Sequence, residues 1–296
     1  MNPSQPLVSV LMTVYNREHF IREAIESVLA STYTNFELII TDDGSTDQSV
    51  LVAREYEAQD KRIHVYQNEK NLGDYPNRNK AASYAKGKYL KYLDSDDIIF
   101  PWGLQAMVFC MEKEPTAAMG FASNMNFNIT YPVLFSSREA YLQYYFKNCL
   151  FCIGPTGTII KKEIFDLLGG FSGEQFMGDT EMWLRIAQKN SVISMPSNLF
   201  YWREHEGQQI VEEKKNFKIE AIRHFLDRKM LKDANCPLNE KEANAICRNL
   251  INIKCRAIIK EFLSAKISKS FNRTKNLNLS LFDFLQSFRK NKVSKF

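Results

Sequence analysis

The sequence predicts an α/β fold in which helices cover both faces of a mostly parallel, partly mixed central sheet, followed by a helical C-terminal extension. Three observations support this prediction. Apolar, strand-like runs alternate with helical patterns over roughly the first 115 residues, an order typical of parallel sheets. Three of these runs end in clusters of polar residues. From about residue 213 the pattern is helical throughout, so we expect two domains, residues 1–212 and residues 213–296.

Four strands and four helices alternate in the first part of the chain. The expected strands are residues 7–15, 36–47, 62–68 and 88–97, and the second and fourth of these end in acidic turns. The expected helices are residues 17–31, 47–59, 76–87 and 101–114. The third helix has Pro76 at its start and Gly87 at its end, which are the favoured positions of these residues.

The pattern loosens after residue 115. We expect strands at residues 117–125 and 156–163, helices at residues 137–148 and 179–190, and a strand pair or an extended segment at residues 191–205. The net charge also changes along the chain. Residues 1–210 hold 19 Lys and Arg against 25 Asp and Glu, whereas residues 211–296 hold 20 against 9. This asymmetry suggests different roles for the two parts.

Composition indicates a cytoplasmic protein. No apolar run is long enough to span a bilayer, and no basic segment precedes the first apolar run, so we expect neither a transmembrane helix nor a signal peptide. The six cysteines lie mostly among apolar neighbours, which favours structural thiols over a metal or redox site. Peripheral contact with the inner face of the cell membrane is an alternative location.

The run "GKYLKYLDSDDIIF", residues 87–100, ends an apolar strand in three carboxylates. Carboxylates this close repel one another, and a cation would relieve the repulsion. Asp94 and Asp96 would point the same way in an extended chain and reach one ligand. An acidic turn with a helix N-cap is the alternative. The strands that end at residues 13–16 and 41–44 should bring further polar side chains to the same edge, where α/β sheets bind ligands.

An acidic cleft can bind an anion through a divalent metal, which points to a nucleotide diphosphate. Neither a phosphate-binding loop of the G-x-x-x-x-G-K-[ST] type nor a G-x-G-x-x-G motif is present. Three blocks resemble the inverting glycosyltransferases of family 2, which have the GT-A fold. They are "VSVLMTVYNREHFIREAIESVLASTYTNFELIITDDGSTD", "NEKNLGDYPNRNKAASYAKGKYLKYLDSDD" and "GGFSGEQFMGDTEMWLRIA", and the resemblance covers roughly residues 6–207.

This resemblance implies a metal-dependent hexosyltransferase that uses a sugar nucleotide and Mn²⁺ or Mg²⁺. Asp94-Ser95-Asp96 matches the family's D-x-D motif, in which Asp96 would bind the metal and Asp94 the ribose or the metal shell. The resemblance places the remaining nucleotide-binding residues at Thr13, Tyr15, Asp43 and Arg78. Tyr15 would stack on the base and Asp43 would accept a hydrogen bond from it. A core aromatic for Tyr15 and a solvated helix charge for Arg78 are the alternatives.

Asp179 matches the family's catalytic base, which removes the proton of the acceptor hydroxyl. An N-cap role for Asp179 is compatible with this. Gly178 stands where the family usually has Glu. Glu181 is a rival base, although its spacing favours a surface ion pair with Arg185. His205 matches a loop histidine that approaches the metal in some relatives, and a surface histidine is an equal alternative.

The donor is expected to be a nucleotide-diphosphate sugar, with uridine favoured, and the acceptor a saccharide or a lipid-linked sugar of surface polysaccharide or glycoconjugate synthesis. The motif of processive synthases is absent, so we expect transfer of one sugar. The basic C-terminal helices could cover the cleft, form a homodimer or contact anionic lipid, although a merely solvated subdomain is favoured. We expect no nucleic-acid partner. A degenerate sugar-nucleotide-binding protein and a sugar-1-phosphate nucleotidyltransferase are the alternatives for the function.

Overall fold

The computed structural model describes residues 5–122, 130–147, 150–174, 176–205, 217–264 and 266–288. The chain forms two compact units, Met1–Glu204 and His205–Phe296, which are described separately below. The division lies eight residues before the predicted domain boundary at residue 212, which itself remains a prediction.

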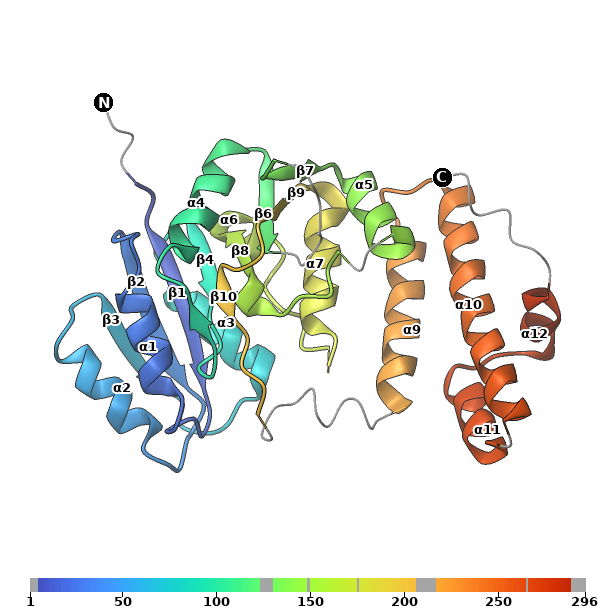
Figure 1. Ribbon diagram of the computed structural model, residues 1–296, viewed down its shortest axis with the longest axis horizontal. Coiled ribbons are helices and arrows are strands. Elements are labelled where there is room, and N and C mark those ends of the chain that lie inside the picture. The colour runs from blue at the N-terminus through green and yellow to red at the C-terminus, as the bar shows by residue number, and fades with distance from the viewer. Residues whose placement is uncertain are drawn as a thin grey trace. The chain divides into compact units, whose positions relative to one another are not determined.

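The first unit is built on an eight-stranded sheet with the order β3-β2-β1-β4-β8-β6-β9-β7 (Figure 1). Its strands are β1 (Val8–Val14), β2 (Phe36–Asp42), β3 (Ile63–Gln67), β4 (Tyr89–Tyr92), β6 (Ala117–Ala122), β7 (Val133–Phe135), β8 (Thr158–Lys161) and β9 (Ser191–Met195). The first four strands are parallel, whereas β8 and β7 run antiparallel to their neighbours. The predicted mixed sheet is therefore confirmed.

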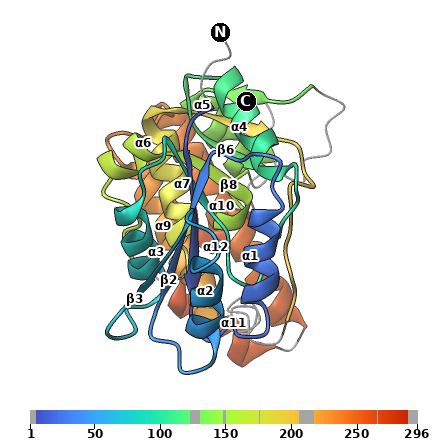
Figure 2. The same cartoon turned by 90° about the vertical axis from the view of Figure 1, so that its left-hand side faces the viewer.

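Helices cover both faces of this sheet. They are α1 (Ile21–Leu29), α2 (Ser49–Glu57), α3 (Asp74–Tyr84), α4 (Gly103–Lys113), α5 (Ser137–Leu142), α6 (Lys162–Leu167) and α7 (Gly178–Lys189), with a π-helical turn at Gln143–Lys147 and a 3₁₀ turn at Pro155–Gly157. Figure 2 shows α1 and α4 on one side of the sheet and α3 and α6 on the other. Because both faces are covered, β1 and β2 are nearly continuous buried runs.

The second unit contains four helices among its described residues. They are α9 (Phe217–Lys232), α10 (Glu240–Leu263), α11 (Ile267–Asn276) and α12 (Leu281–Ser287). The starts of α10 and α12 are each fixed by a capping box, formed by Asn239 with Glu242 and by Ser280 with Asp283. The helical C-terminal extension expected from the sequence is therefore present. No helix in the described part of the chain is both long enough and apolar enough to cross a bilayer.

Several local expectations were wrong. Residues 191–205 contain two strands, β9 and β10 (Phe200–Tyr201), but these do not pair with each other: β9 joins the main sheet, and β10 pairs with β5 (Ile98–Ile99) in a separate two-stranded sheet. β5, β7 and α6 are too short to give a clear periodic signal and were not expected. Cys152 is disulfide-bonded rather than a thiol. Cys110, Cys236, Cys247 and Cys255 are free.

Candidate active site

The carboxyl ends of β1, β2 and β4 meet at one edge of the sheet. β1 runs parallel to both neighbours, with Thr13 opposite Thr41 and Leu11 opposite Tyr92. The polar residues that follow these three strands are therefore brought to a common edge, as the strand pattern predicted. Ligands bind at this edge in α/β sheets because the loops and helix starts that follow the strands converge there.

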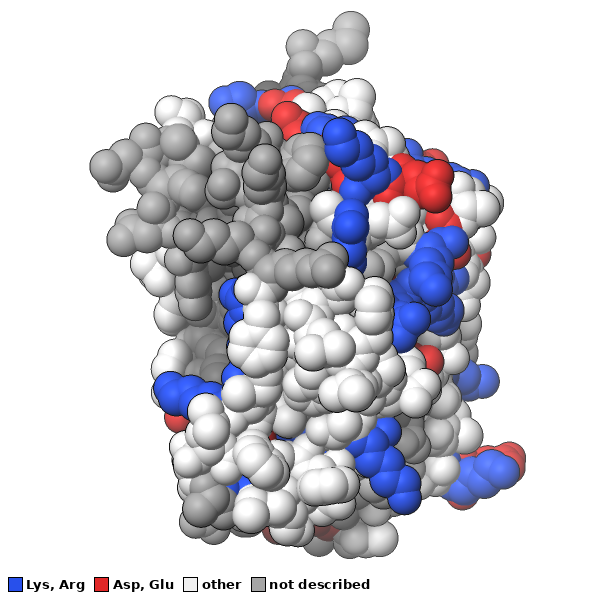
Figure 3. Space-filling view, turned by 90° about the vertical axis from the view of Figure 1, so that its right-hand side faces the viewer, with Lys and Arg blue, Asp and Glu red and all other residues white. Residues whose placement is uncertain are grey.

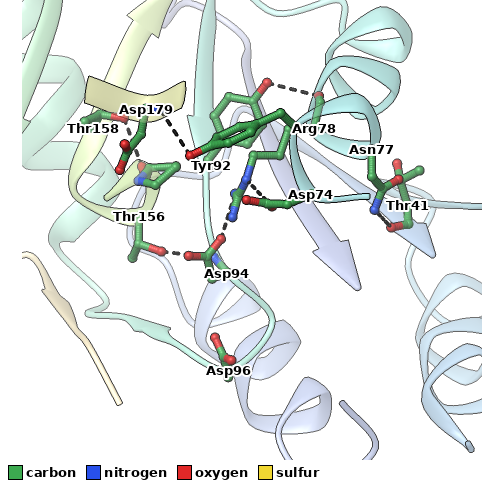
Figure 4. A network of polar contacts seen from close by, with 12 residues as sticks. Thr41, Asp74, Asn77, Arg78, Tyr92, Asp94, Asp96, Thr156, Thr158 and Asp179 are labelled. Carbon is green, nitrogen blue, oxygen red and sulfur yellow. Dashed lines mark hydrogen bonds and ion pairs between the residues drawn. The ribbon is translucent and has the colours of Figure 1, made fainter. Parts of the chain in front are cut away.

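A buried arginine joins α3 to the acidic end of β4. The Arg78 guanidinium lies 2.7 Å from Oδ1 of Asp74 and 2.7 Å from Oδ1 of Asp94 (Figure 4). Burial lowers the pKa of Arg78, but the two carboxylates more than offset this effect, and the net pKa lies well above the ordinary value. Arg78 is only 7% exposed. It is therefore not a solvated helix charge, which the sequence had left open.

Residues 94–97 form a turn and do not continue β4, which ends at Tyr92. The N–H of Asp97 donates to the carbonyl of Asp94 at 2.9 Å. The expectation that Asp94 and Asp96 point the same way assumed an extended chain, and that assumption is wrong. Figure 4 shows the two carboxylates apart, with Asp94 bonded to Arg78 and Asp96 separate from that pair.

Asp96 is held by two arginines that the sequence did not single out. Nε of Arg17, in the loop between β1 and α1, donates to Oδ2 of Asp96 at 2.9 Å. Nε of Arg203, in the segment after β10, donates to the backbone carbonyl of Asp96 at 3.1 Å. Both arginines are remote from Asp96 in the sequence, so no local pattern could have linked them. Asp96 thus lies where three segments of the first unit meet.

Buried polar groups form hydrogen bonds on the inner side of the acidic turn. The Lys91 amino group donates to the carbonyls of Tyr92 and Thr156, and the Thr156 hydroxyl accepts from the N–H of Asp94 at 3.1 Å. Burial lowers the pKa of Lys91 to about 7. Burial, aided by the nearby Asp94 carboxylate, raises the pKa of Asp97 to about 7. The turn is therefore anchored by hydrogen bonds on its buried side.

Asp43 is buried, and both of its oxygens accept hydrogen bonds from the loop before α3. Oδ1 accepts from the Asn68 side-chain amide at 2.9 Å and from the N–H of Leu72 at 2.8 Å. Oδ2 accepts from the N–H of Gly73 at 2.9 Å. Asp43 therefore shapes this loop. The predicted contact with a nucleotide base would be additional to these bonds and stays a prediction.

Tyr15 and Thr13 lie at the same edge. The Tyr15 side chain is 47% exposed, so Tyr15 is not a core aromatic, and its ring is accessible for stacking. Thr13 lies in β1 and is partly buried. Their roles in nucleotide binding remain predictions.

Asp179 lies in the first turn of α7, one position inside the helix. The N-cap is Met177 and Asp179 is the second residue of the helix, so the expectation that Asp179 is the N-cap was wrong. Burial raises the pKa of Asp179 to about 6, while the N–H of Thr180, which donates to Oδ1 at 2.6 Å, and the Arg78 charge act in the opposite direction. A carboxylate with this pKa is ionised at neutral pH and is more basic than an ordinary aspartate, as general-base catalysis requires.

Gly178 and Tyr75 pack directly against each other at the start of α7. The Tyr75 hydroxyl accepts from the N–H of Gly178 at 3.0 Å and from the N–H of Asp179 at 3.3 Å. A Cβ atom at Gly178 would lie 2.6 Å from the Tyr75 ring. A glutamate side chain at position 178 would therefore collide with Tyr75 of α3 as the two helices are placed here.

Glu181, the rival base, is buried rather than at the surface. Its Oε2 accepts from the Ser172 hydroxyl at 2.7 Å and lies 3.6 Å from Nη1 of Arg185. The predicted partner is correct, but the predicted surface location is wrong. Glu181 is therefore engaged by Ser172 and Arg185 within the fold of the first unit.

The part of the chain that the structure describes contains no group of three His, Cys, Asp or Glu side chains arranged to hold a metal ion. His205 is the first residue of the second unit, and its role as a metal ligand stays a prediction. The donor set at the acidic turn nonetheless fits Mg²⁺ or Mn²⁺, because it consists of oxygens. Oδ2 of Asp97 is buried there without a hydrogen-bond partner. Mg²⁺ is commonly held by one or two carboxylates together with substrate phosphates.

Comparison with known proteins identifies the family. The sequence profile described as "Glycosyl transferase family 2" matches residues 9–168, which is more than half of the chain. The chain belongs to glycosyltransferase family 2. It is therefore a transferase, and the fold and family expected from the sequence are confirmed.

Individual relatives agree with this assignment. The chain is 33% identical over 188 residues to the Escherichia coli protein named UDP-Glc:alpha-D-GlcNAc-diphosphoundecaprenol beta-1,3-glucosyltransferase WfgD, covering 63% of this chain and 72% of WfgD. Residues 1–349 of Staphylococcus aureus TarS, solved in complex with UDP-GlcNAc, superpose with a TM-score of 0.66 at 18% identity, covering 95% of this chain and 79% of that one. The Pyrobaculum calidifontis mannosyltransferase PcManGT, solved with GDP-Man and Mn²⁺, gives a TM-score of 0.63 at 15% identity, covering 99% and 88%. The two structures support the fold.

Proposed function

We propose that this glycosyltransferase moves one sugar from a nucleotide-diphosphate sugar to an acceptor hydroxyl with inversion at the anomeric carbon. The donor would bind at the edge formed by β1, β2 and β4. Asp179 would act as the base, and Asp96 would hold Mn²⁺ or Mg²⁺ together with the donor diphosphate. A degenerate sugar-nucleotide-binding protein would share the donor site but not the turnover.

The observation that carries this proposal is the position of Arg78. Its guanidinium is bonded to Asp94 of the acidic turn, and its charge also acts on Asp179 at the start of α7. One buried side chain thus connects the expected donor-binding carboxylates with the expected base. A single-displacement reaction requires this proximity, because the acceptor oxygen must attack the anomeric carbon while the diphosphate leaves.

The chemistry of the base follows from its surroundings. Inverting transfer needs one group that takes the acceptor proton as the oxygen attacks, and no covalent enzyme intermediate. Asp179 lies in the first turn of α7, and the positive end of the helix favours its ionised form. Burial outweighs this and raises its pKa to about 6, so the carboxylate is ionised at neutral pH but readily accepts a proton. When bound, the divalent cation supplies positive charge that stabilises the leaving diphosphate. The Arg17 guanidinium, which is ion-paired with Asp96, adds a positive charge at the same turn.

The donor and the acceptor are proposed from the side chains and the relatives. An exposed Tyr15 suits stacking on a base, and Asp43 suits a hydrogen bond to its N–H, which favours uridine. WfgD, by its name, uses UDP-Glc and a sugar linked to diphosphoundecaprenol. A UDP-sugar donor and a saccharide or lipid-linked acceptor in surface glycan synthesis are therefore our proposal. A homodimer formed through the second unit remains an option for the assembly.

The test is calorimetric titration of the full chain with UDP, GDP and their common sugars, with and without Mn²⁺. Binding of one nucleotide that strengthens with Mn²⁺ is expected, and the sugar series would then identify the donor. Binding without any release of nucleotide in the presence of sugar acceptors would favour the degenerate binder. No binding of any nucleotide with Mn²⁺ present would contradict the proposed donor site.

A further inference from the structure

One face of the second unit exposes a set of large apolar side chains. We call it the apolar face, and it consists of Leu281, Phe282, Leu285 and Phe288 on α12 and at its C-cap. Helix α11 also exposes Ile267 and Phe271. The residues of the apolar face recur at positions i, i+1, i+4 and i+7, so they form one side of α12. Phe282 is 65% exposed and Leu285 is 61% exposed. Such a group of exposed aromatic and aliphatic residues is characteristic of an interaction surface.

The apolar face is not the core of its unit. The core of the second unit contains other residues, including Leu226, Met230, Ile246 and Ile258, which are nearly fully buried. Both α11 and α12 pack on α10, and the capping box at Ser280 fixes where α12 begins. Because α12 is anchored on one side, its opposite, apolar side is left exposed.

The charge around this face is strongly positive. From residue 262 to the end, the sequence holds eight Lys and Arg residues and one acidic residue, Asp283. Two of the eight, Lys269 and Arg273, are ion-paired with Glu261 and Glu220. Four of the basic residues fall in the last eight positions, directly after α12. Lys266 and Lys275 are exposed on and beside α11. Figure 3 shows a broad area without charged side chains, with Lys and Arg side chains around it and acidic side chains among them at its right-hand margin.

We propose that the apolar face docks on the surface of a bilayer that contains anionic phospholipid. Aromatic and aliphatic side chains on one side of a short helix insert at the level of the lipid headgroups, and flanking Lys and Arg residues are attracted to anionic lipids. Nucleic acid would use the positive charge but has no need of the aliphatic residues. A second copy of the chain would use the apolar residues but would be repelled by the same positive charge. This inference goes beyond the proposed reaction and does not depend on the donor site.

The experiment is flotation of the full chain with vesicles made from equal parts of phosphatidylcholine and phosphatidylglycerol, and with vesicles of phosphatidylcholine alone. The protein should float with the anionic vesicles, float much less with the neutral ones, and be released at about 0.5 M salt. The affinity of the double variant Phe282→Ser/Leu285→Ser for anionic vesicles should fall at least about tenfold. The control variant Phe109→Ser/Leu167→Ser changes two exposed residues of the first unit and should float like the wild type.

Circular dichroism and thermal unfolding of both variants will show that the folded structure is retained, as expected for exposed positions. Absence of the wild-type protein from the floated anionic vesicles would overturn the proposal. So would flotation that Phe282→Ser/Leu285→Ser leaves unchanged. Dimerisation without lipid that this variant abolishes, together with no vesicle binding, would instead assign the face to a second copy.

Discussion

The N–H of Gly178 donates to the hydroxyl of Tyr75 at 3.0 Å, and a Cβ at Gly178 would lie only 2.6 Å from the Tyr75 ring. This contact fixes the start of α7, on which Asp179 is carried, against α3, which carries Arg78. The two helices are far apart in the sequence. The position of the expected base therefore depends on a side chain roughly 100 residues away.

Gly178→Glu should be poorly tolerated for this reason. The new side chain would force the Tyr75 ring or the first turn of α7 to move, and overpacking of this kind costs about 1–3 kcal/mol. We expect a lower melting temperature and a loss of turnover. Tyr75→Ala in the same chain should recover part of both. Thermal unfolding and turnover assays of the single and double variants will measure this, and no recovery in the double variant would contradict the coupling.

Asp96→Asn should reduce the effect of metal on nucleotide binding. The amide removes the negative charge that attracts the cation but keeps the size of the side chain and one oxygen. We expect the dependence of UDP affinity on Mn²⁺ to fall at least about tenfold, on the order of 1.4 kcal/mol. Calorimetric titration with and without Mn²⁺ will measure the change. Glu18→Gln, which alters a carboxylate in the loop before α1, is the control and should keep the wild-type dependence.

The rate should depend on pH through Asp179. Its carboxylate accepts a proton only when ionised, and its pKa is raised to about 6. Transfer should therefore fall about tenfold per pH unit below that value and level off above it. A pH profile of kcat/KM for the wild-type chain will test this. A profile that stays flat down to about pH 5 would show that another group takes the proton.

The same pKa predicts an effect on stability. When the pKa of a carboxyl is higher in the folded than in the unfolded chain, the folded state binds more protons between the two pKa values. The free energy of unfolding of the protein therefore falls as the pH rises from about 4 to about 6. Asp179→Asn removes this cost. The free energy of unfolding of the variant should therefore exceed that of the wild type by about 1–3 kcal/mol near pH 8, and by less near pH 4. Denaturant unfolding at the two pH values will measure it, and an equal difference at both would contradict the assignment.

Much of the fold could be predicted because its signals are local. The apolar runs and helical periods before residue 115 locate β1 to β4 and α1 to α4 within a few residues. The polar clusters after these strands predicted a common edge, because parallel strands end on the same side. The antiparallel strands β7 and β8 gave weaker signals, since they are short and their pairing partners are distant in the sequence.

The contacts of the site could not be predicted in the same way. Arg78 is buried because Asp74 and Asp94 neutralise it, and the sequence alone did not show that these groups converge. Arg17 and Arg203 reach Asp96 from segments about 79 and 107 residues away, so no spacing rule connects them. The turn at residues 94–97 changed the directions of two carboxylates for which an extended chain had been assumed.

The most direct test of the account is Asp179→Asn, examined for donor binding and for transfer in the same preparation. Donor affinity should change by less than about twofold, while transfer should fall by about 10²–10⁴-fold. Calorimetry with the donor that the nucleotide and sugar titrations identify gives the first quantity, and release of the nucleotide diphosphate in the presence of acceptor gives the second. Glu181→Gln serves as the comparison with the rival carboxylate. Transfer by Asp179→Asn at close to the wild-type rate would contradict the role of Asp179 as the base.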